Sequence, residues 1–150
     1  MHELLLGTHL SIAGGMPRAV ESAARLQCNA LQVFVKNPSR WEGKEISDEE
    51  AGEFRSLANR HGIRETVAHS SYLINLASPD DSLRRRSIKA VIDELDRCSR
   101  LGLSSLVIHP GSHREEGETK GIKMVAKALS EVLGKRSEER RVGKECRSRW

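Results

Sequence analysis

Three histidines in this sequence, His9, His69 and His109, each close a short apolar segment. A neutral imidazole can ligate a divalent metal such as zinc. If the apolar segments are neighbouring parallel strands, the side chains that follow them converge at one edge of a sheet, where barrels and open α/β sheets build their sites. The spacing therefore favours a shared metal or phosphate site, with His69 and His109 holding one divalent ion. For each histidine taken singly, a hydrogen-bonded residue at a strand end is the alternative.

Two imidazoles do not complete a zinc site, because zinc takes about four ligands. The segment that contains His113, Glu115 and Glu116 could supply more of them. A solvated charged turn explains that segment better, so these three residues stay outside the predicted site.

Two loop segments that would lie at the same edge carry cationic, amide and aromatic side chains. Residues 36–41 read Lys-Asn-Pro-Ser-Arg-Trp, and residues 70–75 read Ser-Ser-Tyr-Leu-Ile-Asn. Arg and Lys donate to phosphate oxygens, Asn adds a neutral donor, and Tyr stacks on bases or wedges between them. Both segments therefore suit a nucleic-acid backbone. For Trp41, packing against the rim of the sheet is the favoured interpretation.

The elements that must position these loops alternate four times between a short apolar segment and an amphipathic one. The apolar segments, at residues 4–9, 30–35, 65–69 and 104–109, have the length of buried strands. Each is followed by a segment whose apolar residues recur with the helical period. Ser47 and Glu50 form a capping box at the start of the second helix, and Ser78 is the predicted cap of the third.

Four strand-helix units predict an α/β fold with a parallel sheet. Because an eightfold barrel of such units takes about 250 residues, the chain matches the first four βα units of a TIM barrel, with two open sheet edges. Residues 1–134 form this half barrel. Residues 135–150 lack a strand period and are almost without apolar content. We interpret them as an unrelated C-terminal tail, non-native or disordered, with a native basic arm as the alternative.

The net charge of +4 is concentrated in that tail. Seven of the 25 Lys and Arg residues and three of the 21 acidic residues lie in it, so the rest of the chain carries 18 of each sign. Global basicity is therefore no argument for a DNA partner. No apolar run approaches the roughly 20 residues of a membrane span, and the amino end lacks a signal-peptide pattern. We expect a cytoplasmic protein.

Four segments, in this order, resemble the strand-end motifs of endonuclease IV, the family 2 AP endonucleases. They are residues 7–15 (Gly-Thr-His-Leu-Ser-Ile-Ala-Gly-Gly), 34–37 (Phe-Val-Lys-Asn), 69–76 (His-Ser-Ser-Tyr-Leu-Ile-Asn-Leu) and 106–113 (Leu-Val-Ile-His-Pro-Gly-Ser-His). The resemblance implies a TIM barrel that cleaves the phosphodiester 5′ to abasic sites in double-stranded DNA during base excision repair. It also implies a cluster of three zinc ions.

Carried over residue by residue, the resemblance implies metal ligands and DNA contacts, with no catalytic residue beyond the metal ligands. The metal ligands are His69 and His109. The DNA contacts are His9, Asn37, Arg40 and Tyr72. Tyr72 would probe the strand near the lesion. Where that family has Arg-Gln before the tryptophan, this chain has Ser39-Arg40.

The family's remaining metal ligands, carboxylates and histidines of later strands, would follow residue 134. We therefore expect an incomplete copy of the enzyme, with little or no activity of its own and no obligate protein partner. A sugar isomerase or epimerase of the xylose-isomerase type is one alternative, because such enzymes also gather histidines and acids at strand ends. A non-catalytic fragment that binds DNA through its basic tail is the other. The cationic and aromatic loops suit a duplex better than a small sugar.

Overall fold

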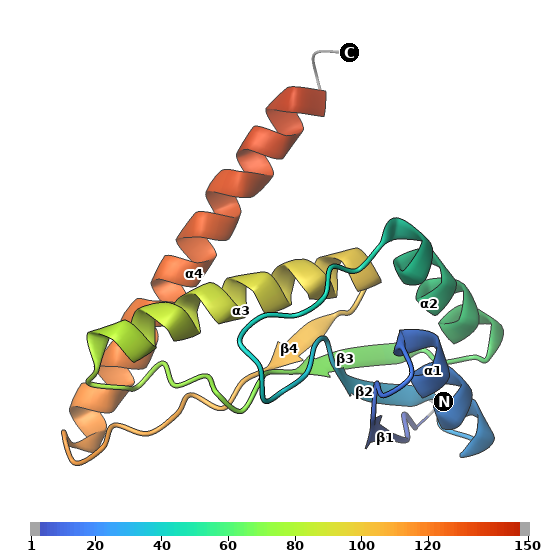
Figure 1. Cartoon of the computed structure of the whole chain (residues 1–150), viewed down its shortest axis with the longest axis horizontal. Coiled ribbons are helices and arrows are strands. Elements are labelled where there is room, and N and C mark those ends of the chain that lie inside the picture. The colour runs from blue at the N-terminus through green and yellow to red at the C-terminus, as the bar shows by residue number, and fades with distance from the viewer. Residues whose placement is uncertain (1–3, 148–150) are drawn as a thin grey trace. The chain divides into compact units, whose positions relative to one another are not determined.

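The computed structural model of this chain describes residues 4–147, and the side chains of residues 4–137. Strands and helices alternate along it as β1 (Gly7–Leu10), α1 (Met16–Arg25), β2 (Ala30–Phe34), α2 (Asp48–Arg60), β3 (Glu65–His69), α3 (Asp81–Leu101), β4 (Ser105–Val107) and α4 (Glu118–Arg147) (Figure 1). The strands pair side by side in chain order, and every pair is parallel. The predicted fold, four βα units on a parallel sheet, is confirmed.

The chain divides into two compact units. The first contains the described residues up to Leu73 together with Asp93–Ile108, and it therefore holds the whole sheet, α1, α2 and the later part of α3. The second contains Ile74–Ile92 and the described residues from His109 onward. The predicted boundary at residue 134 is a different division of the chain, and it stays a prediction.

The core of the first unit lies between one face of the sheet and the helices that cover it. Leu31 and Val33 of β2 are buried there, while Gln32 and Phe34 are only half-buried. Small residues of α1 and the fully buried Phe54 of α2 pack in the same cluster. Because successive side chains of a strand point to opposite faces, Gln32 and Phe34 lie on the other face. This second face carries the candidate site.

The helix starts agree with the sequence at one position and differ at another. Ser47 caps α2 as predicted, since its Oγ accepts from the Glu50 N–H at 3.1 Å. The prediction that Ser78 caps α3 is wrong. Asp80 is the cap, because its Oδ1 accepts from the backbone N–H groups of residues 82 and 83 at 2.8 and 3.2 Å. Ser78 Oγ accepts from the Asp80 N–H instead and forms a turn ahead of the helix.

Helix α4 is longer than the sequence predicts, and only some of its apolar residues are buried. The sequence places its end near Gly134, but the helix continues to Arg147. Ala128 and Val132 are buried, whereas Ile122 and Leu133 are exposed. The side chains of residues 138–150 lie outside the described part, so the separation of a C-terminal tail remains a prediction. Within the described residues, no helix is long and apolar enough to cross a membrane.

Candidate functional site

Four aromatic rings meet on the second face of the sheet, near the carboxyl ends of the first three strands. Parallel pairing sets Phe34 beside His69 and places His9 one strand further along. The ring centroids of His9 and His69 are 5.9 Å apart, and Phe34 lies 4.5 Å from His9 and 5.5 Å from His69. Tyr72, in the loop after β3, completes the cluster at 5.3 Å from Phe34 and 6.1 Å from His69. Two predicted DNA contacts and one predicted metal ligand therefore lie together.

The backbone carbonyl of the next residue orients the ring of His69. Its Nδ1 lies 2.8 Å from the carbonyl oxygen of Ser70. Since a carbonyl only accepts hydrogen bonds, Nδ1 is the donor in this bond, which leaves Nε2 as the ring nitrogen that could bind a metal. Histidines that ligate metals commonly donate their other ring N–H to a carbonyl in this way. The geometry is that of an oriented ligand, and the role of His69 itself stays a prediction.

His9 is less free to take up a proton than an ordinary histidine. Burial lowers its pKa and the nearby His69 lowers it further, while the hydrogen bond with Gln32 opposes these effects in part. That bond joins His9 Nδ1 to Gln32 Oε1 at 3.0 Å. A neutral His9 suits hydrogen bonding at the sheet edge better than ion pairing with a phosphate.

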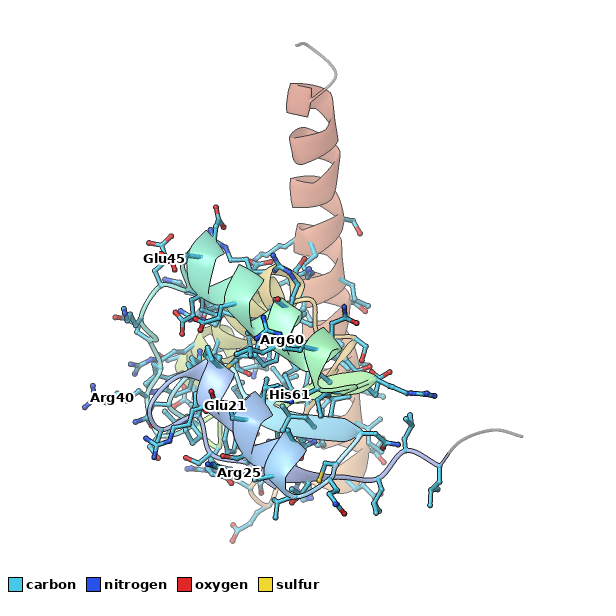
Figure 2. The ribbon with its side chains drawn as sticks, turned by 90° about the vertical axis from the view of Figure 1, so that its right-hand side faces the viewer. Glu21, Arg25, Arg40, Glu45, Arg60 and His61 are labelled. Atoms are coloured by element: carbon cyan, nitrogen blue, oxygen red, sulfur yellow. The ribbon has the colours of Figure 1, made fainter. Side chains whose placement is uncertain are left out.

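The loop after β2 presents two of the predicted DNA contacts to solvent. Asn37 begins a tight turn, because its Oδ1 accepts from the Ser39 N–H at 2.9 Å and its carbonyl accepts from the Arg40 N–H at 3.1 Å. Arg40 is exposed and extends outward from this loop (Figure 2). The exposed Tyr72 belongs to the neighbouring loop and donates its N–H to the Pro38 carbonyl at 3.2 Å. The two loops are therefore in direct contact.

Lys36 is not available to phosphate, contrary to the suggestion from the sequence. Its side chain is 2% exposed, and its Nζ donates to Asp93 at 3.0 Å and to the Trp41 carbonyl at 2.9 Å. Burial raises the pKa of Asp93, but hydrogen bonds from Lys36 and Arg97 outweigh burial and hold it below its ordinary value. The lysine is an internal tether of the loop after β2.

Glu94 belongs to the same network, and the sequence pattern does not predict it. The Ser71 N–H points at its carboxylate, 3.1 and 3.4 Å from the two oxygens, and Lys36 Nζ lies 3.5 Å away. Burial raises the pKa of Glu94, and Lys36 and Ser71 offset this rise only in part. The one feature of the sequence that could have indicated burial of Glu94 is its position in the helix. Glu94 stands in the apolar stripe of α3, three residues after Val91 and four before Cys98.

His109 follows β4 and belongs to the second unit, where it is exposed. The segment after it is fixed by Asn75, whose side chain exchanges two hydrogen bonds of 3.1 Å with the backbone of Ser112. A partnership of His109 with His69 therefore stays a prediction. Among the described residues there is no group of three or more His, Cys, Asp or Glu able to hold a metal ion. The chemistry of two imidazoles suits zinc, but their number falls short of the about four ligands it takes.

A parallel sheet with a helix after each strand, and with polar groups at the carboxyl ends, defines an α/β protein of the barrel type. A sequence model of xylose isomerase-like TIM barrels matches residues 20–142, and the chain belongs to this family. The match covers the sheet from β2 onward together with the later part of α1.

Within this family, the chain is most informatively compared with proteins that share the name probable endonuclease 4. A protein of Trichlorobacter lovleyi named probable endonuclease 4 is 41% identical over 128 residues, which are 85% of this chain and 46% of the relative. A protein of the same name from Chloroflexus aurantiacus is 45% identical over 127 residues, covering 85% of this chain and 45% of the relative. The chain thus spans about half the length of these relatives. The predicted resemblance to endonuclease IV is confirmed.

Solved structures agree. Endonuclease IV from Thermus thermophilus is similar with a TM-score of 0.71 and 36% identity, over 84% of this chain and 46% of that one. A D-psicose 3-epimerase is similar with a TM-score of 0.62 over 85% of this chain and 47% of that one, but at 15% identity. The second likeness shows the fold alone.

Proposed function

We propose that this chain is the N-terminal part of a zinc-dependent endonuclease that cleaves the phosphodiester 5′ to abasic sites in double-stranded DNA. The observation that carries the proposal is the ring cluster, in which the exposed phenol of Tyr72 lies 6.1 Å from His69, and His69 in turn lies 5.9 Å from His9. The relatives named probable endonuclease 4 support it.

The described side chains divide the work of binding. Tyr72 is exposed and backed by Phe34, so its ring can stack on a base or enter the gap that a missing base leaves. Arg40 is an exposed cation on the adjoining loop and can donate to a backbone phosphate. Asn37 keeps its amide nitrogen as a neutral donor, because its oxygen is used within the turn. His9 adds a hydrogen-bonding group on the strand side of the cluster.

Metal binding is assigned to His69 through Nε2 and to His109. Zinc, when bound, supplies a Lewis acid that polarises the phosphodiester. Two imidazoles leave the zinc sphere incomplete, so we propose that further ligands come from the remainder of a full-length enzyme. On this reasoning the 150-residue chain is inactive by itself.

A chimera tests the proposal. Residues 4–134 are joined to the C-terminal half of Thermus thermophilus endonuclease IV, and the product is assayed on a duplex with one abasic site, with and without a chelator. We expect incision 5′ to the site, lost on chelation and with His69→Ala, and kept with His61→Ala, which alters an exposed histidine at the end of α2. The loss with His69→Ala should exceed the about 10- to 100-fold that follows removal of a group that merely orients a metal ligand.

Three outcomes would contradict the proposal. Incision that persists in chelator would remove the metal from the reaction. A folded chimera that turns over a ketose and leaves abasic DNA intact would favour the sugar isomerase alternative. Salt-dependent binding of undamaged DNA that disappears on deletion of residues 135–150 would favour the non-catalytic fragment.

A further inference from the structure

Two arginines on the later part of α3, Arg97 and Arg100, form a polar stripe that is hydrogen-bonded to the loop after β2. Arg97 Nη2 donates to the Gly43 carbonyl at 3.0 Å, and Nη1 donates to the Lys44 carbonyl at 2.7 Å. Arg100 Nη1 donates to the Ile46 carbonyl at 3.0 Å. These bonds join segments more than 50 residues apart in sequence. The stripe therefore holds the part of the loop furthest from the strand.

Glu94 extends this stripe to both loops of the candidate site. It is 1% exposed, pairs with Lys36 at the root of the loop after β2, and accepts from the Ser71 N–H in the loop after β3. Ser71 Oγ in turn donates to the Pro38 carbonyl at 2.6 Å. A movement of either loop must therefore break a bond to the other loop or to Glu94.

We propose that Glu94 is a positioning residue, whose buried carboxylate fixes the separation of the two loops that carry Arg40 and Tyr72. The inference rests on the proposed function for its consequence in DNA binding, but the positioning itself does not depend on it. A carboxylate has two oxygens in one plane, so it can satisfy Ser71 and Lys36 together only when the two loops keep one arrangement.

The effect of Glu94 on the position of the loops can be measured apart from its effect on the stability of the fold. Removing one partner of a buried ion pair destabilises a fold when it leaves the other charge without a partner. When Glu94 is replaced, Lys36 keeps Asp93 at 3.0 Å and the Trp41 carbonyl at 2.9 Å, so no buried charge is left uncompensated. Glu94→Met should therefore keep the fold, although the Ser71 N–H loses its acceptor. The bonds of Glu94 to Ser71 and Lys36 are lost, and only the direct bonds to the Pro38 carbonyl still join the two loops. A residue with a merely structural role would instead show its effect in stability.

The test uses the 150-residue chain with Trp150→Phe, which leaves Trp41 as the single tryptophan. Trp41 reports on the loop, because its carbonyl is bonded to Lys36. Acrylamide quenching of Trp41 and the Kd for an abasic duplex, by fluorescence anisotropy, are measured for Glu94→Met and Glu94→Gln. Glu53→Met, at an exposed position of α2, is the matched control.

For Glu94→Met we expect a circular dichroism spectrum like that of the control and a Tm lower by a few degrees, because the Ser71 N–H loses its acceptor. We also expect stronger quenching of Trp41 and a Kd raised by about tenfold, which matches the loss of one charged hydrogen bond. Glu94→Gln should fall between, because its amide oxygen can still accept from Ser71. Quenching and Kd equal to those of Glu53→Met would overturn the proposal.

Two further results remain decisive. If Glu94→Met fails to fold, Glu94→Gln is compared with the parent chain, and quenching equal to the parent would overturn positioning. If the parent chain binds abasic and undamaged duplexes alike, the proposed function fails while the quenching experiment still decides the role of Glu94.

Discussion

The substitution Lys36→Met tests the buried network most directly. It preserves side-chain volume while it removes the cation from a site where Lys36 is 2% exposed and Glu94 is 1% exposed. Glu94 then keeps the Ser71 N–H but loses the charge of Lys36, which lies 3.5 Å from its carboxylate. Breaking a buried pair from one side leaves an uncompensated charge, and the free energy of unfolding should fall by about 3–5 kcal/mol at pH 7.

The loss should depend on pH in a defined direction. Burial already raises the pKa of Glu94 above its ordinary 4.5, and Lys36 opposes this rise. Without Lys36, the pKa in the folded state must rise further, while the pKa in the unfolded state does not change. A carboxyl whose folded pKa lies above the unfolded one weakens the fold at neutral pH, and this weakening is relieved as pH falls through the folded pKa toward 4.5. The cost of Lys36→Met should therefore shrink between pH 7 and pH 5.

Urea unfolding followed by circular dichroism at both pH values measures this cost. Lys44→Met is the matched control, because it removes an exposed lysine from the same loop. It should change the free energy of unfolding by no more than about 0.5 kcal/mol at either pH. Equal losses for the two variants, or a loss for Lys36→Met that is the same at pH 5 and pH 7, would refute the reasoning.

Two other predictions concern His9 and Gly111. Because the pKa of His9 is lowered in the folded state, the neutral ring stabilises the fold above about pH 6.5, and this stabilisation is lost as pH falls below that value; His9→Gln should flatten the fall in Tm between pH 7 and pH 5, and an unchanged profile would contradict this. Gly111 has φ +98° and an added Cβ would overlap Asn75, whereas Gly117 has φ +87° with open space around it. Gly111→Ala should therefore cost about 1–3 kcal/mol more than Gly117→Ala in urea unfolding, and equal costs would show that Asn75 yields.

The sequence by itself was enough to predict the order of elements and the strand that His69 ends. The predicted ends of the first and fourth strands are wrong, because β1 continues to Leu10 and β4 stops at Val107, two residues before His109. The order of elements follows from local patterns, since a short apolar run indicates a buried strand and a 3.6-residue period of apolar residues indicates a helix. His69 ends β3 and His9 is the residue before the end of β1. Both lie on the face opposite Leu31 and Val33, because the parallel register sets His9 beside Gln32 and His69 beside Phe34. The motif resemblance added the predicted roles.

Tertiary structure decided which charged residues are buried and which meet solvent. Lys36 and Arg40 look equally suited to phosphate in the sequence, yet only Arg40 of the two is exposed. The difference comes from Asp93 and Glu94, which lie 57 and 58 positions further along the chain and reach Lys36 only when the later part of α3 packs against the sheet. Burial of an ion pair depends on partners from distant segments and on the solvent that both lose, and no local pattern of residues records either.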